Sequence, residues 1–254
     1  MGMTAETLVE AAEELAACVD ELKFSHPVSH VYNPLRYAWD PHRRYLQRYG
    51  CGSRRVLFVG MNPGPWGMAQ TGVPFGEVEA VTGWLGIRGR VDAPRREHPK
   101  RPVFGFDCER NEVSGRRLWG LMRDRFGSPD AFFANHFVGN YCPLVFLESS
   151  GRNRTPDRLP ADQRDALYRV CDRHLRTVID LLRPEWLIGI GRFAEERILA
   201  ATEAGSGSRG ARCGRGPRCG RILHPSPANP QANRDWAGQV EAALVECGVW
   251  ARNS

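Results

Sequence analysis

Lysine is almost absent from this chain: Lys23 and Lys100 are its only lysines, and all the other residues in the Lys+Arg total of 35 are arginines. Enzymes that work through a Schiff base need a lysine or a terminal amine as the nucleophile. Neither lysine adjoins Asn62, Asn140 or His224, the polar residues that follow the predicted strands. The sequence therefore argues against Schiff-base chemistry.

A long apolar run and an export signal are also missing. No segment is apolar over a length that could span a membrane, so we expect no membrane partner. The N-terminus carries Glu6, Glu10, Glu13 and Glu14 where a signal peptide would carry basic and then apolar residues. We expect an intracellular protein, in the cytoplasm or nucleoid of a bacterium or in the nucleus of a eukaryote.

The eight cysteines contain no Cys-x-x-Cys pair, the spacing typical of redox and zinc sites. Scattered cysteines of this kind are typical of reduced thiols that pack as small apolar groups. Cys213 and Cys219 share one loop but have no further metal ligands nearby in the sequence. We therefore expect no bound metal and no other cofactor.

The bulk composition is that of an ordinary globular protein, with 42% hydrophobic and 25% charged residues. A length of 254 residues is enough for one large domain with a full core, and we expect residues 1–254 to form a single domain. The net charge of +6 favours a polyanionic partner.

Apolar strand-like runs alternate with helical patterns along the chain. We expect strands over 54–61, 132–140, 185–191 and 221–224. We expect helices over 4–22, 114–126, 160–182, 192–201 and 231–247. The segments 32–42 and 73–105 are expected to be irregular, and the glycine- and arginine-rich segment 205–220 to be a flexible loop. This alternation predicts a parallel sheet with helices on both faces.

The segment 56–77 is the most informative part of the sequence. A β-branched and aromatic run ends at Gly60, and Asn62 follows between Met61 and Pro63. Glycines and prolines then recur up to Gly76. A buried strand that ends in a stiffened, glycine-lined loop is where open α/β folds place their chemistry.

Polar side chains lie at the ends of three of the predicted strands, just past their apolar runs: Asn62, Asn140 and His224. Each has an ordinary structural explanation, since an asparagine before proline often ties a turn and a single histidine is usually hydrogen-bonded in the fold. In a parallel sheet, however, all three would open on the same edge. This coincidence predicts a functional site there.

The chain has no Walker loop and no serine-histidine-acid or cysteine-histidine set of familiar spacing. Asn62 is no general base, but its amide can hold a water molecule. Asn140 offers a donor and an acceptor side by side, which matches the edge of a nucleobase. His224 can donate to an oxygen that becomes anionic. These roles fit a hydrolysis that releases a stabilised base anion.

At these residues the chain resembles the single-strand-selective monofunctional uracil-DNA glycosylases, a branch of the uracil-DNA glycosylase superfamily. The motifs that carry the resemblance are Gly60-Met-Asn-Pro-Gly-Pro-Trp-Gly-Met-Ala-Gln-Thr-Gly-Val-Pro-Phe-Gly-Glu77, Glu97-His-Pro-Lys-Arg-Pro102, Glu112-Val-Ser-Gly115, Asn140-Tyr-Cys-Pro143, Ser150-Gly-Arg-Asn153 and His224-Pro-Ser-Pro-Ala-Asn-Pro230. They span nearly the whole chain, from about Phe24 to Trp236.

The resemblance implies a three-layer α/β/α sandwich around a short, mainly parallel four-stranded sheet. It implies removal of uracil and 5-hydroxymethyluracil from single- and double-stranded DNA by a monomeric enzyme without lyase activity. Asn62 would hold the attacking water, and His224 would support the departing uracil through its O2. Phe75 would stack on the flipped base, and Asn140 would read its edge. The residues implied to line or read the base pocket are Met61, Gly64, Phe75 and Asn140.

The resemblance also implies a DNA-contacting segment: Pro225, Ser226, Pro227, Ala228, Asn229, Pro230 and Arg234. Relatives usually carry arginine where this chain has Ala228, so strand opening would rely on Asn229, Pro230 or Arg234. The segment 205–220 looks longer than in animal relatives and is interpreted as a tolerated insertion.

Other functions stay open from the sequence. One alternative is a mismatch-directed uracil/thymine glycosylase, a branch that lacks the histidine of the last motif. Another is a glycosylase for xanthine or other deaminated bases. A lesion-binding module without catalysis is the third, although binding alone would not need Asn62.

Overall fold

A four-stranded parallel sheet of order β3-β2-β6-β7 forms the centre of the computed structural model, which describes residues 7–203 and 216–252. The strands are β1 (Val28–Tyr32), β2 (Val56–Gly60), β3 (His136–Asn140), β4 (Val145–Glu148), β5 (Asn153–Arg154), β6 (Trp186–Ile190) and β7 (Arg218–Ile222). Every residue of β2 and β6 is buried, as expected for the inner strands of a parallel sheet covered on both faces.

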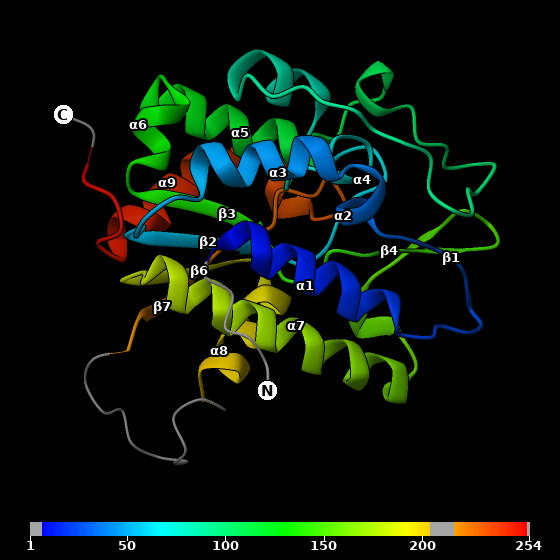
Figure 1. The fold of residues 1–254 in the computed structure, drawn as a ribbon. Helices are drawn as coiled ribbons and strands as arrows, with labels where there is room; N and C mark the ends of the chain where they lie inside the picture. Colours follow the sequence, from blue (N-terminus) through cyan, green and yellow to red (C-terminus); the bar gives the residue numbers. More distant parts are fainter. Residues whose placement is uncertain (1–6, 204–215, 253–254) are drawn as a thin grey trace.

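Helices cover both faces of this sheet, with α3 and α5 on one side and α7 and α8 on the other (Figure 1). The α-helices are α1 (Leu8–Asp20), α2 (Pro34–Tyr37), α3 (Trp39–Tyr49), α4 (Met68–Thr71), α5 (Val113–Phe126), α6 (Pro129–Phe133), α7 (Ala161–Leu182), α8 (Arg192–Glu203) and α9 (Trp236–Glu246). Shorter helical turns are η1 (Ala80–Trp84), η2 (Gly105–Asp107), η3 (Pro156–Arg158) and η4 (Pro230–Asn233). The predicted three-layer α/β/α architecture is confirmed.

A second, antiparallel sheet of order β1-β4-β5 lies beside the layers (Figure 1). This sheet was not predicted from the sequence. Its strands are short, and β4 directly follows a proline-containing site loop, so periodicity could not separate them from loop.

The prediction of irregular structure over 32–42 is wrong, because this segment contains α2 and the start of α3. Pro34 is the first residue of α2, where Asn33 caps the helix. Pro41 lies in the first turn of α3, where its missing N–H has no intrahelical acceptor. Both prolines thus lie in the first turn of a helix.

Other predicted boundaries shift by a few residues. The segment predicted as a strand over 132–140 begins in α6, and β7 starts three residues before its predicted start. The end of the predicted flexible loop, residue 220, therefore lies inside β7, and most of the rest of that loop lies outside the described residues. The start of the predicted helix 4–22 also lies outside them. Thr7 caps α1 through a capping box with Glu10. No helix within the described ranges combines the length and apolar character needed to cross a membrane.

Two buried histidines make the fold sensitive to acid. Burial lowers the pKa of His42 and of His136 to about 4. His136 is held as a neutral ring, since Nδ1 donates to the Phe132 carbonyl at 2.9 Å and Nε2 accepts from Trp250 Nε1 at 3.0 Å. Protonation would remove that second hydrogen bond.

Acidification from pH 7 to 5 is therefore expected to lower the thermal midpoint. Below pH 6.5 His42 and His136 bind protons in the unfolded chain but stay neutral in the folded protein. This difference lowers the free energy of unfolding by roughly 1–3 kcal/mol for each ring. Glu112, whose pKa burial raises to about 7, works in the opposite direction, but it is one group against three, because burial also lowers the pKa of His174 to about 4. Thermal denaturation at both pH values checks this, and an unchanged or higher midpoint at pH 5 would contradict it.

Candidate active site

The ends of β2, β3 and β7 bring the three predicted polar residues to one edge of the sheet. Gly60 pairs with Asn140 at the end of the β2–β3 ladder, and Ile190 pairs with Ile222 at the end of the β6–β7 ladder. From β2 the next strand, β3, is added on one side of the sheet, and β6 and β7 are added on the other. The boundary between β2 and β6 is therefore the switch point, where open α/β sheets bind ligands. The predicted convergence of the three strand ends is confirmed.

Asn62 is oriented by backbone carbonyls, the Pro63 oxygen at 3.5 Å and, more closely, the Leu144 oxygen. Its Nδ2 donates to the Leu144 oxygen at 3.0 Å, and because a carbonyl only accepts, this contact assigns the amide nitrogen. The side chain is partly exposed, and its Oδ1 receives no hydrogen bond from any described residue. Asn62 therefore presents a fixed acceptor that can hold a water molecule.

Asn140 has the same arrangement, but its free oxygen is buried. Its Oδ1 is buried and receives no hydrogen bond from the described residues, while Nδ2 donates to Met68 Sδ at 3.3 Å. A buried acceptor without a donor is costly to a fold, by about 1–3 kcal/mol. Such an atom is typical of a site that a ligand completes.

Phe75 forms a wall beside Asn140. Its backbone lies in the left-handed region, at φ 53°, a strained conformation for a residue with a side chain. The ring is close enough to Gly60 that a side-chain carbon there would lie 2.6 Å from Phe75 Cε2 and would also overlap Asn140 Oδ1. The bare backbone at Gly60 thus lets both side chains occupy their places.

His224 is held in one tautomer. Its Nδ1 accepts from the Ser226 backbone N–H at 3.1 Å, so the proton of the neutral ring is on Nε2. Burial lowers the pKa of His224 below its usual 6.5. At neutral pH the ring is therefore uncharged, and Nε2–H is its donor.

The remaining predicted pocket residues belong to the loop after β2. Met61 is partly buried, and its carbonyl accepts from the Cys142 N–H at 2.9 Å. The Gly64 carbonyl accepts from the Ala69 N–H at 3.3 Å. These bonds tie the loop to the segment after β3 and to α4.

The segment after His224 carries the residues predicted to contact DNA. Four of them are exposed: Pro227, Ala228, Pro230 and Arg234. Pro225 is buried. The remaining two are partly buried: Ser226 and Asn229. Asn229 caps η4 by accepting from the Gln231 N–H at 3.1 Å, which fixes its side chain within the segment.

Arg117, which the sequence analysis missed, holds this segment from α5. It donates to the Pro225 carbonyl and to Asn233 Oδ1, each at 2.9 Å. Asn233 in turn donates to the Pro227 carbonyl at 3.0 Å. No local pattern could reveal this contact, because it joins residues more than a hundred positions apart.

Glu112 was also missed as a site residue, although it opens one of the quoted motifs. Its carboxyl lies against Gly64 and Gly67, and its Oε2 is buried without a hydrogen-bond partner among the described residues. Burial, and then the nearby carboxyl of Glu77, raise the pKa of Glu112 to about 7. Composition and spacing give no sign of such an environment.

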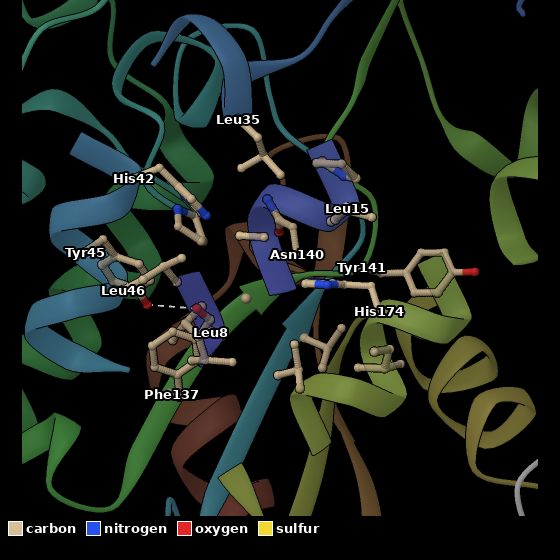
Figure 2. A pocket seen from close by; sticks show the side chains of 18 of the residues that line it. Leu8, Leu15, Leu35, His42, Tyr45, Leu46, Phe137, Asn140, Tyr141 and His174 are labelled. Carbon is tan, nitrogen blue, oxygen red and sulfur yellow. Dashed lines mark hydrogen bonds between the residues drawn. The ribbon is translucent and has the colours of Figure 1, made fainter. Parts of the chain in front are cut away.

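An apolar cavity lies behind Asn140, between the sheet and α1, α3 and α7. Figure 2 shows His42 and His174 entering it from opposite sides, with Asn140 between them. Neither Asn62 nor His224 lines this cavity. It therefore backs the site through Asn140 but is distinct from the place where the three strand ends meet.

A metal site is absent from the part of the chain that the structure describes: no group of three or more histidine, cysteine, aspartate or glutamate side chains there could hold an ion. The groups at the three strand ends described above are two amides, one neutral imidazole and one aromatic ring. Together these groups can hold water, bind a flat polar ring and donate to an oxygen that gains charge.

The comparisons with known proteins agree with this chemistry. The sequence matches the family model described as the uracil DNA glycosylase superfamily over residues 47–244. It is 48% identical over 247 residues to a single-strand selective monofunctional uracil-DNA glycosylase of Rattus norvegicus, covering 96% of this chain and 85% of the rat protein. The similar protein of Bos taurus is 49% identical over 229 residues, covering 90% of this chain and 81% of that protein.

The fold also resembles that of a solved protein. The crystal structure of wild-type Pedobacter heparinus SMUG2 superimposes with a TM-score of 0.63 at 16% identity, covering 94% of this chain and 97% of that one. At this identity the likeness concerns the fold alone.

The tautomer of His224 can be measured directly. We expect nitrogen NMR of the imidazole to show the proton on Nε2 and a pKa below 6.5, because Nδ1 accepts from the Ser226 N–H and burial disfavours the charged ring. A His224→Gln variant assigns the resonance. Finding the proton on Nδ1 of the neutral ring would contradict the orientation described here.

Proposed function

The chain belongs to the uracil DNA glycosylase superfamily, and we propose that it hydrolyses the N-glycosidic bond of uracil flipped out of DNA. The product is an abasic site, which the later steps of base excision repair process. The observation that carries the proposal is the orphaned amide oxygen of Asn140 at the same sheet edge as Asn62 and His224. A nucleobase edge supplies the donor that this oxygen lacks.

Asn140 explains selection of uracil over cytosine. Its Oδ1 accepts from the uracil N3–H, and its Nδ2 turns from Met68 to donate to O4. Cytosine has an unprotonated N3 and an amino group at these positions, so both hydrogen bonds would be lost in a buried site. Such mismatches of buried polar groups carry discrimination of about 10⁴–10⁵ in enzymes built this way.

Asn62 and His224 divide the reaction between them. Asn62 holds the water through Oδ1 but cannot take its proton, so bond cleavage depends on the stability of the leaving uracil anion. His224 Nε2–H donates to uracil O2, where negative charge develops, and a preorganised donor of this kind is worth about 10²–10³ in rate. The neutral ring is suited to this role because it binds the charge without giving up its proton.

The base must leave the stack to reach this site. Phe75, 8% exposed and held beside Gly60, offers a ring face on which the flipped base stacks. Gly64 presents no side chain at the pocket wall, and the Glu112 carboxyl lies against it. Because no side chain at position 64 closes this wall toward C5 of the base, we include 5-hydroxymethyluracil among the substrates.

A basic and aromatic rim beside the site fits the DNA backbone. The guanidinium carbons of Arg110 and Arg101 lie 4.4 and 5.4 Å from the centre of the Trp66 ring. Neither arginine forms an ion pair within the described residues, and Phe104 nearby is 56% exposed. Uncompensated arginines with exposed aromatic rings are typical of surfaces that bind single-stranded nucleic acid, and a single protein copy provides the whole rim.

Asn62→Ala is expected to bind uracil-containing DNA as the wild type does and to lose most of its turnover. The substitution removes the water acceptor but leaves Asn140, Phe75 and His224 in place. Single-turnover excision assays and binding titrations on one oligonucleotide check this. An equal loss of affinity would show that Asn62 binds the substrate instead of positioning water.

Affinity for DNA is expected to fall steeply with salt, and Arg101→Ala/Arg110→Ala should reduce the log–log slope by about 1.5, since two phosphate contacts are removed. Arg183→Ala removes an arginine at the opposite edge of the sheet and serves as the control. A slope that is flat in the wild type, or unchanged in the double variant, would exclude this rim as the phosphate-binding surface.

A further inference from the structure

Within the described residues, the side-chain amide of Asn140 has one hydrogen-bond partner, Met68. The amide nitrogen Nδ2 lies 3.3 Å from Met68 Sδ. A thioether sulfur carries no hydrogen, so the sulfur accepts and the nitrogen donates. The other amide atom, Oδ1, is buried without a donor. Because the nitrogen and oxygen of an amide have nearly the same size, this sulfur contact decides which of them lies on which side.

The fold fixes Met68 and Asn140 independently of each other. Asn140 is the last residue of β3, in the ladder with β2. Met68 is 2% exposed and begins α4. Gln70 of the same helix donates through Nε2 to the carbonyls of Pro65 and Pro102, at 2.9 and 3.0 Å. The sulfur is therefore held in place before any ligand arrives.

Turning the Asn140 amide end for end would break its one hydrogen bond. Oδ1 would then face Met68 Sδ, and two acceptors form no hydrogen bond. Nδ2 would move to the place of Oδ1, which lies beside Gly60 and the ring of Phe75. The contact with the sulfur therefore favours one of the two orientations of the amide.

The two orientations match different bases, and this step rests on the proposed function. With Oδ1 toward N3 and Nδ2 toward O4, Asn140 matches uracil, whose N3–H donates and whose O4 accepts. With the amide turned, Asn140 would match cytosine, whose N3 accepts and whose amino group donates. Selection of uracil therefore requires an asparagine that is also held one way round.

A thioether suits this task because it is a weak acceptor. When uracil binds, Nδ2 turns from the sulfur to O4, and a weak hydrogen bond is given up easily. A stronger acceptor in the same place would orient the amide but compete with O4. Met68 and Asn140 both line the apolar cavity of about 60 Å³ behind the site (Figure 2). This space lets the flexible methionine side chain move aside.

We propose that Met68 is a positioning residue for base selection, whose sulfur takes the place of uracil O4 in the free protein and keeps the Asn140 amide in the orientation that reads uracil. Met68 acts through Asn140, by making the cytosine-reading orientation a minor one. Such an equilibrium changes selectivity by the population ratio of the two orientations. One hydrogen bond to a weak acceptor sets that ratio at about fivefold.

The test replaces Met68 in two ways that separate hydrogen bonding from packing. Met68→Leu keeps an apolar side chain of similar volume and removes the acceptor. Met68→Gln keeps the length of the side chain and supplies an amide oxygen as acceptor. Binding is measured with single-stranded oligonucleotides that carry one 2′-fluoro-2′-deoxyuridine or one 2′-fluoro-2′-deoxycytidine, whose glycosidic bonds resist cleavage.

The measured quantity is the Kd of the cytosine probe divided by that of the uracil probe. We expect this ratio to fall about fivefold in Met68→Leu and to stay within about twofold of wild type in Met68→Gln. Uracil excision by Met68→Leu should stay within about threefold of wild type, since most of its amide still reads uracil. Met122→Leu makes the same exchange at a buried methionine of α5 and serves as the matched control.

Nuclear magnetic resonance reports the orientation of the amide in the free protein. The wild type should show a nuclear Overhauser effect between the Nδ2 hydrogens of Asn140 and the methyl group of Met68. In Met68→Leu, new effects from these hydrogens to the Phe75 ring should appear as the turned amide becomes populated. An amide that keeps its single wild-type orientation in Met68→Leu would overturn the proposal.

The outcomes separate the role of Met68 from the proposed function. Wild-type protein without uracil excision would refute the function itself. A wild-type ratio near one would refute base reading by Asn140 and the role of Met68 with it. Intact uracil excision with an unchanged ratio in Met68→Leu, or selectivity lost in Met68→Gln alone, would show that Met68 only packs. A large drop in the thermal midpoint of Met68→Leu would likewise indicate a packing role and overturn the proposal.

Discussion

The parallel pairing of β2 with β3 is the constraint on which the site depends. It places Gly60 directly opposite Asn140, so the loop that carries Asn62 starts beside the amide of Asn140. The pairing continues past the strands, where the N–H groups of Tyr141 and Cys142 donate to the carbonyls of Gly60 and Met61 at 2.9 Å. A shift of one residue in this register would turn Asn140 to the other face of the sheet, and the two asparagines would no longer serve one ligand.

Backbone contacts orient the polar groups and leave their other atoms for the substrate. The Leu144 carbonyl takes the amide nitrogen of Asn62, and the Ser226 N–H takes Nδ1 of His224. Each contact comes from a loop next to a strand end, so the geometry of the sheet is passed to the reacting atoms without long flexible side chains. Preorganisation of this kind stabilises charge that develops during hydrolysis.

Much of the fold and of the proposed site could be predicted from the sequence. The spacing of apolar residues predicts buried strands and helices of ordinary length, and the motif around Asn62 indicates a strand end. The helices over 32–42 escaped prediction because Pro34 and Pro41 were interpreted as breaks, although both lie in first turns. Arg117 and Glu112 escaped for a different reason: their roles arise from contacts between segments distant in the sequence, which no local pattern records.

A crystal structure of the protein with free uracil and abasic DNA tests the central claim most directly. The account predicts that Asn140 Oδ1 accepts from uracil N3–H while Nδ2 contacts O4, that His224 Nε2 donates to O2, and that a water lies on Asn62 Oδ1 facing the sugar. Uracil bound away from Asn140, or presenting a different edge to it, would contradict the account.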